Sequence, residues 1–318
     1  MRALEQGIAG LRASGRRLVA RSGRAARPAR LDLSLVPDGA EAFTASDWRR
    51  VLVRAVDWLG PVAVHVLAPD QADDPLLADL IRFAHRLECR VTLFTNGRGI
   101  DLARAEELVD HGLAAVVIGM GGVSDPLQQR LTGASAEAAL GALRALGAAR
   151  ADRGLPLDIE VSLAWVQGAA AEGRAVLGLA RQAGADGFSV VLPYHGHQLD
   201  PDAATLHELL ATPAPYNRSA AHIAEAYAAM LPERGEAPGA AREGLGAAGR
   251  LPCPVGGERL SVSRSGRLVS CPFQAPIVPR VGDVRADWVA HAAPHLHAIR
   301  ACSRACAHPE LAPTPLLG

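Results

Sequence analysis

The sequence predicts an α/β protein in two parts, a parallel sheet of six strand–helix units followed by a small cysteine-bearing domain. Short strand-like runs alternate with helical periods from residue 31 to residue 192. Four of the five cysteines lie between Cys253 and Cys306. A stretch rich in Gly, Ala, Glu and Arg over residues 232–249 has little to bury and separates the two parts.

The first thirty residues have a composition of their own. They contain eight arginines and a single acid, Glu5, and Leu4, Ile8 and Leu11 follow a helical period. This pattern predicts a basic leading helix and linker. Three interpretations fit this pattern. The segment is a helix that simply faces solvent, a docking element for an acidic partner or peptide, or a leader of the transit-peptide type.

Six runs rich in apolar and β-branched residues are expected to be strands, over residues 31–36, 62–67, 91–95, 115–119, 157–163 and 187–192. Helical periods follow over residues 48–59, 76–87, 101–112 and 135–153, and a fifth ends near Ala183. Thr44 or Ser46 is expected to cap the first helix, and Asp101 the third. Each helix returns the chain to the same end of the sheet, so the units predict a parallel sheet. Six units are too few for a closed eight-stranded barrel.

The cysteines near the end of the chain are spaced like metal ligands. Two short alternating strands joined by a Ser265-Gly266 turn are expected to bring Cys271 back toward Cys253. Cys302 and Cys306 form a second clip. Four thiolates suit either a tetrahedral zinc or an iron–sulfur cluster, and four unrelated cysteines are the remaining alternative. The fifth, at position 89, is expected to be a buried core thiol.

The run from Cys253 through Gly266 to Cys271 resembles the C-x(9–15)-G-x(4)-C signature that opens the SPASM and Twitch domains of radical S-adenosylmethionine (radical SAM) enzymes. Cys302 and Cys306 resemble the closing pair. The resemblance implies that these four cysteines hold one auxiliary [4Fe–4S] cluster.

Two weaker motifs in the first part point to the same family. Thr95-Asn96-Gly97 is similar to its TNG motif, and Arg130-Leu-Thr-Gly133 is similar to its R-x-x-G motif. The resemblance implies a partial (β/α)6 TIM-like barrel of the radical SAM type with a small C-terminal SPASM/Twitch-like domain. The expected divisions are a basic helix and linker over 1–30, the barrel over 31–200, a helical connection and linker over 201–250, and the iron–sulfur domain over 251–318.

The sequence departs from the family at the two motifs that serve S-adenosylmethionine. The loop after the first strand, residues 37–45, lacks the C-x(3)-C-x(2)-C triad and contains no cysteine. The loop after the second strand, residues 68–75, lacks a GGEP-like motif. The resemblance therefore implies a pseudoenzyme, and the sequence does not favour S-adenosylmethionine as a cofactor.

Other polar residues stand at expected strand ends, where ligands collect in parallel α/β sheets. His195 and His197 follow the sixth strand and point the same way if the segment is extended, so they are candidate barrel-mouth contacts. Asp70, Asp73 and Asp74 follow the second strand, where they either cap the next helix or supply carboxylates.

Three functions fit these observations. The chain is a non-cleaving binding or electron-transfer partner in peptide or cofactor maturation, with a peptide or an active radical SAM enzyme as its partner. Alternatively, it is an enzyme, either a radical SAM-type oxidoreductase or one with altered chemistry at His195 and His197. In the third, zinc stabilises a binding protein. The zero net charge gives no reason to expect nucleic acid, no apolar run reaches the roughly 18 residues of a membrane span, and thiolate ligands favour the cytoplasm.

Overall fold

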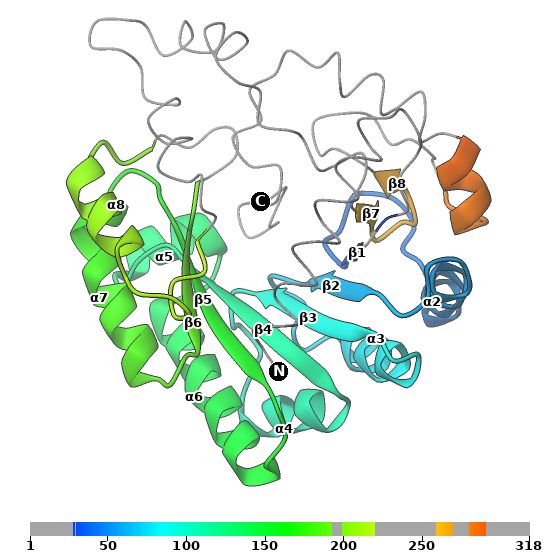
Figure 1. The fold of residues 1–318 in the computed structure, drawn as a ribbon, viewed down its shortest axis with the longest axis horizontal. Coiled ribbons are helices and arrows are strands. Elements are labelled where there is room, and N and C mark those ends of the chain that lie inside the picture. The colour runs from blue at the N-terminus through cyan, green and yellow to red at the C-terminus, as the bar shows by residue number, and fades with distance from the viewer. Residues whose placement is uncertain (1–27, 29, 193–198, 220–258, 270–279, 291–318) are drawn as a thin grey trace, which may run out of the picture.

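The computed structural model of the chain describes residue 28 and residues 30–192, 199–219, 259–269 and 280–290. These residues form one curved sheet with helices along its outer side (Figure 1). Within these ranges, no helix has both the length and the apolar composition that crossing a bilayer requires.

All six predicted strands are present and pair in parallel, each with the next one in the chain. They are β1 (Arg30–Ser34), β2 (Ala63–Leu67), β3 (Arg90–Thr95), β4 (Leu113–Met120), β5 (Asp158–Ala164) and β6 (Gly187–Val191). Among the described strands, β6 ends the sheet on one side and does not pair with the strand at the other end. The sheet is therefore a partial (β/α)6 barrel, as predicted.

The labelled helices are α2 (Ala45–Leu59), α3 (Pro75–Arg86), α4 (Leu102–Asp110), α5 (Asp125–Thr132), α6 (Ala136–Arg153), α7 (Ala169–Gln182) and α8 (Ala203–Leu210), and residues 284–290 are also helical. Thr44 caps α2 in a reciprocal pair with Asp47, and Asp101 caps α4, which confirms both predicted starts. Helix α5 was not predicted, because its eight residues include too few turns to show a period.

The cysteine-bearing tail contributes a hairpin to the sheet. Strands β7 (Arg259–Val262) and β8 (Leu268–Val269) pair in antiparallel fashion around Gly266, as the Ser-Gly turn predicted. No sequence pattern indicated that β7 also pairs in parallel with β1. The sheet therefore runs in the order β6-β5-β4-β3-β2-β1-β7-β8.

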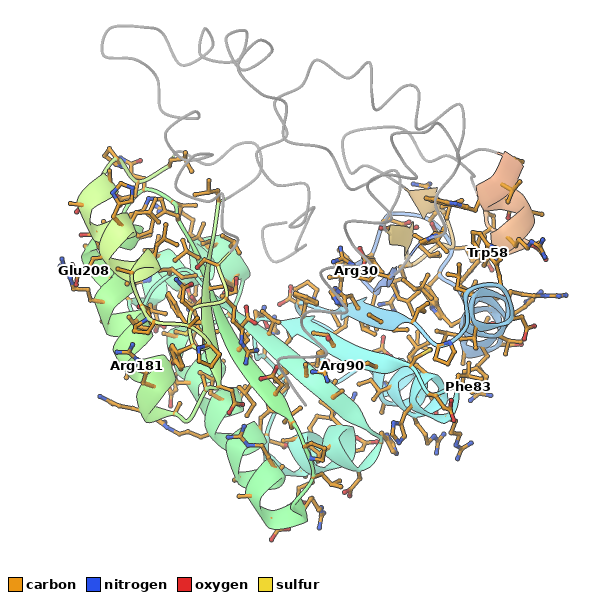
Figure 2. All side chains as sticks on the ribbon, viewed as in Figure 1. Arg30, Trp58, Phe83, Arg90, Arg181 and Glu208 are labelled. Carbon is orange, nitrogen blue, oxygen red and sulfur yellow. The ribbon has the colours of Figure 1, made fainter. Side chains whose placement is uncertain are left out.

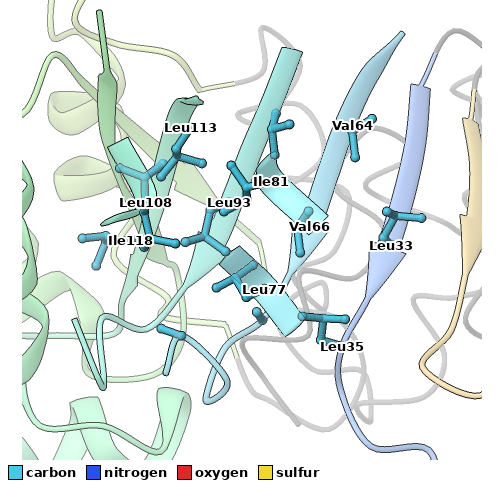
Figure 3. Close-up of a cluster of buried hydrophobic side chains, with 14 of the residues drawn as sticks. Leu33, Leu35, Val64, Val66, Leu77, Ile81, Leu93, Leu108, Leu113 and Ile118 are labelled. Atoms are coloured by element: carbon cyan, nitrogen blue, oxygen red, sulfur yellow. The ribbon is translucent and has the colours of Figure 1, made fainter. Parts of the chain in front are cut away.

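The main hydrophobic core lies between the outer face of the sheet and the helices (Figure 3). Leu33, Val64 and Leu93 point from neighbouring strands toward this layer and are at most 1% exposed. Cys89 is also buried, and burial raises the pKa of its thiol, so it is the core thiol that the sequence predicted.

Candidate functional site

The loop after β1 is held by the tail hairpin. A carboxylate oxygen of Asp38 accepts hydrogen bonds from the hydroxyls of Ser263 at 2.7 Å and Ser265 at 2.5 Å. Burial opposes the charged form, but these hydrogen bonds outweigh it and keep the pKa of Asp38 below its usual value. The carboxylate in the loop that lacks cysteine is therefore engaged in a structural contact.

The same loop is also held by packing. The backbone N–H of Phe43 donates to the carbonyl of Arg264 at 2.7 Å, and its ring meets Trp48 edge-on with 5.4 Å between centroids. A Cβ on Gly266 would lie 1.8 Å from the Phe43 ring, and this glycine has a φ of +79°. Gly266 thus serves both the hairpin turn and the close approach of the hairpin to the loop.

The residues of this loop do not fit an iron–sulfur cluster that is held by three thiolates and keeps one iron open. Residues 37–45 provide no thiolate, and Thr44 is engaged with Asp47 at the start of α2. One oxygen of Asp38 accepts both hydroxyl hydrogen bonds, and the other, Oδ1, is buried with no hydrogen-bond partner among the described residues. No ligand set of the family type is present in this loop.

Two of the three acids in the loop after β2, Asp70 and Asp74, make structural contacts. Asp74 accepts from the backbone N–H of Leu76 at 2.9 Å and caps α3, as predicted. Asp70 accepts from the side-chain amide of Asn96 at 2.6 Å. These contacts fix the start of α3 and hold the loop against the loop after β3.

The Thr95-Asn96-Gly97 motif connects three segments of the chain through hydrogen bonds. The amide of Asn96 also donates to the carbonyl of Thr132 at 2.7 Å, so it links the loops after β2 and β3 to the end of α5. Gly97 has a φ of +86°, and a Cβ there would lie 2.9 Å from the Cα of Ala139 in α6. In this chain the motif has a packing role.

The remaining predicted site residues lie outside the described residues. These are the barrel-mouth histidines His195 and His197 and the four proposed metal ligands Cys253, Cys271, Cys302 and Cys306. Elsewhere in the described ranges, no group of three or more His, Cys, Asp and Glu side chains is arranged to hold a metal ion.

A polar row crosses the inner face of the sheet. Strand pairing places Asp32 beside His65, His65 beside Thr92, Thr92 beside Ala115 and Ala115 beside Asp158. Residues that pair in register point to the same face, so the five side chains form one row across β1 to β5. In Figure 2, Arg30 and Arg90 lie on this inner side of the sheet.

A second row lies one step closer to the carboxyl ends of the strands. It consists of Leu67, Phe94, Val117 and Glu160, again by register. The ring of His65 lies 5.0 Å from that of Phe94, centroid to centroid, which connects the two rows.

The two rows line a cavity of about 330 Å³ together with Arg30, Arg90 and Arg218. Its volume lies in the range of small-molecule sites. We call it the inner-face cavity.

Arginine–carboxylate pairs stand on both sides of the inner-face cavity. On one side, Nε of Arg30 lies 2.8 Å from a carboxylate oxygen of Asp32. On the other, Arg218 donates to both oxygens of Asp158 at 2.7 and 2.8 Å. Such two-point pairs fix the orientation of both groups.

Glu160 lies beside the second pair. Burial raises its pKa, although a hydrogen bond from the Ser189 hydroxyl at 2.6 Å and the guanidinium of Arg218 at 3.4 Å act in the opposite direction. Its charged form is therefore less stable here than in water.

The inner-face cavity was not predicted from the sequence. The signal was present as polar residues at alternate positions in predicted strands, such as Asp32 in β1 and Glu160 in β5. A parallel sheet packed on both faces lacks this alternation.

Solved structures with this fold include two of SuiB and one of anSMEcpe. SuiB from Streptococcus suis bound to S-adenosylmethionine is 16% identical, covers 92% of this chain and 70% of its own, and has a TM-score of 0.64. SuiB bound to the precursor peptide SuiA is 14% identical over 92% of this chain and 71% of its own, with a TM-score of 0.65. Native anSMEcpe with bound AdoMet is 12% identical over 84% of this chain and 82% of its own, with a TM-score of 0.54.

These neighbours are radical SAM enzymes, and the chain shares their fold. No protein-family model and no curated protein matches the sequence.

Proposed function

We propose that this chain is a radical SAM-fold protein that does not cleave S-adenosylmethionine and acts as a binding or electron-transfer partner in peptide or cofactor maturation. The loop after β1 supports this most strongly. In that position the chain has Asp38 bonded to two hydroxyls and Phe43 packed under Gly266, with no thiolate. Reductive cleavage needs a reducible cluster with an open iron, and this loop offers it no ligands.

The loop after β2 supports the same proposal independently. The family uses this loop to bind the methionine amino group. Here Asp70 is engaged by Asn96, and Asp74 caps α3. The chain therefore lacks ligands for an open-iron cluster and a site for the methionine amino group. In both loops the polar residues hold the fold together instead.

A peptide is the partner that the neighbours favour. SuiB has been solved with a precursor peptide, SuiA, on a chain of the same fold. We propose that this chain binds a peptide or the surface of an active radical SAM enzyme at the mouth of its barrel, with His195 and His197 among the contacts.

The tail in this proposal carries one auxiliary [4Fe–4S] cluster. The ligands would be Cys253, Cys271, Cys302 and Cys306. Four protein thiolates leave no iron open, which suits structure or electron transfer rather than substrate activation.

The decisive experiment concerns S-adenosylmethionine. The reconstituted protein is incubated anaerobically with dithionite and S-adenosylmethionine, and 5′-deoxyadenosine is measured by mass spectrometry beside an active enzyme of the same fold. We expect none from this chain and turnover from the reference enzyme. Catalytic turnover by this chain would overturn the proposal.

The cluster has a test of its own. Anaerobic reconstitution should give about four irons and four sulfides per chain, as a single cube requires. The Cys271→Ala variant should lose most of this iron, whereas Cys89→Ala should keep it, because Cys89 is a core residue. Stoichiometric zinc without iron uptake would favour the zinc-stabilised binding protein instead.

A further inference from the structure

The ionised side chains around the inner-face cavity pair with one another. Arg30 donates to both oxygens of Asp32, at 2.8 and 3.3 Å. Arg218 donates to both oxygens of Asp158 and also lies 3.4 Å from an oxygen of Glu160. Each of these charges therefore already has a counter-charge within the lining.

The third arginine of the lining, Arg90, belongs to the same network, because its guanidinium lies 3.9 Å from Asp158. With His65 neutral, the three arginines and three acids of the lining cancel. A ligand with a net charge would have to break one of these pairs or lie beside a like charge, and both are costly. The lining therefore favours an uncharged ligand.

An apolar row lies between the charged groups. Leu67, Phe94 and Val117 pair in register across β2, β3 and β4, and all three line the cavity. Neighbouring strands are about 4.8 Å apart, so the row is about 10 Å long, which suits a compound with a single ring. The cavity volume of about 330 Å³, at the low end of the range for small-molecule sites, agrees with a ligand of this size.

The aromatic side chains of the lining favour a flat ring in particular. The rings of His65 and Phe94 lie 5.0 Å apart at an angle of 43°. A third ring can pack beside them edge to face, an arrangement that stabilises aromatic pairs beyond the burial of their surface. An aliphatic ligand would lack this contribution.

Glu160 supplies a hydrogen-bond acceptor at the end of the apolar row. It pairs in register with Val117 and therefore lies one strand further along. One of its oxygens accepts from the Ser189 hydroxyl at 2.6 Å, and Arg218 lies 3.4 Å from the other. Each carboxylate oxygen can accept more than one hydrogen bond, so Glu160 can also accept from a ligand hydroxyl without losing either partner.

We propose that the inner-face cavity binds a small uncharged phenol, with its ring over Phe94 and Val117 and its hydroxyl donating to Glu160. The spacing of roughly 4.8 Å between the strands of Val117 and Glu160 brings the hydroxyl of a ring above Val117 within reach of the carboxylate. This site is separate from the proposed function, since it uses neither the cysteines nor the loops after β1 and β2.

The test is calorimetric titration of the full chain with 4-methylphenol and three matched probes. 4-Methylanisole has the same ring without the hydroxyl donor, 4-hydroxyphenylacetate adds a negative charge to the phenol, and tyramine adds a positive one. We expect 4-methylphenol to bind at least tenfold more tightly than each of the other three. The proposal is overturned if 4-methylphenol does not bind, or if any of the other probes binds as tightly.

Glu160→Met tests the hydrogen bond directly. The variant lacks the acceptor, so 4-methylphenol should lose its tenfold advantage over 4-methylanisole, which corresponds to about 1.4 kcal/mol. A change that only disturbs the cavity would weaken both probes and keep their ratio, and an unchanged ratio would contradict the proposal. Glu137→Met makes the same substitution at an exposed position of α6 and should keep the ratio of the parent.

Ala115→Leu tests whether the ligand lies in the cavity. Ala115 lines the cavity two residues before Val117 on the same strand, so a larger side chain there takes up space that the ring needs. Binding of 4-methylphenol should weaken about tenfold or more, whereas Ala103→Leu, at an exposed position of α4, should bind as the parent does. Parent-like binding by folded Ala115→Leu would overturn the proposal. If circular dichroism shows that this variant does not fold, the ratio measured with Glu160→Met decides the question alone.

Discussion

The two faces of one sheet differ sharply in chemistry. On the outer face, Leu33, Val64 and Leu93 pack against the helices and are almost completely buried (Figure 3). On the inner face, Asp32 and Thr92 belong to the same strands but point toward the inner-face cavity. Because successive side chains alternate between faces, a step of one residue separates the packing of the fold from its polar interior. Substitutions one residue apart on the same strand should therefore have very different effects on stability.

The largest expected effect tests the outer face. Leu93→Ala should lower the free energy of unfolding by about 3 kcal/mol, because it removes buried methyl groups and leaves a cavity. Thr92→Ala, one residue away, should cost less than about 1 kcal/mol. Urea unfolding followed by circular dichroism measures both. Equal losses would mean that the inner face is as tightly packed as the outer.

The next effect tests whether the inner face contributes stability through its charges. Arg218→Met leaves Asp158 and Glu160 without their guanidinium, and Arg218 is 29% exposed at its side chain. This partial exposure places the expected loss at about 1–2 kcal/mol, below that of a fully buried pair.

Arg174→Met is the matched control for this loss. Arg174 makes a similar two-point pair with Glu208, but both side chains are more than half exposed. Its unfolding free energy should not change measurably. If both variants lose the same stability, the inner-face position adds nothing to an arginine–carboxylate pair.

The smallest effect depends on pH. Because the pKa of Glu160 is raised in the folded state, only the folded chain holds this proton between the unfolded and folded pKa values. Stability from this group is therefore fully present below the unfolded pKa and is lost as the pH rises through the folded pKa.

Glu160→Gln removes this dependence. The difference in unfolding free energy between variant and parent should shift in favour of the variant from pH 4 to pH 7, because the other titrating groups cancel. Unfolding at both pH values measures it. A difference that does not change with pH would show that Glu160 has the same pKa folded and unfolded.

The sequence predicted those parts of the fold that depend on local pattern. A few neighbouring residues are enough to encode each of these features. They are the apolar residues of each strand, the caps at Thr44 and Asp101, and the turn at Gly266. They appeared where they were expected.

The candidate site could not be predicted in the same way. Arg218 reaches Asp158 from 60 residues away, and no local pattern shows that pair. The row from Asp32 to Asp158 depends on the register of five strands, which only the assembled sheet determines. The polar alternation shows that an inner face exists, but it does not show which charges meet there.

The parallel pairing of β1 with β7 has a consequence for how the chain folds during synthesis. Arg30 of β1 pairs with Arg259 of β7, which is synthesised 229 residues later. One edge of β1 therefore stays unpaired until β7 has been made. Until then, the ribosome-bound chain carries an open strand edge, and such edges are templates for pairing with other chains. Closing so long a loop is also slow. Of the strand edges that pairing closes in the described sheet, this edge of β1 therefore stays open longest.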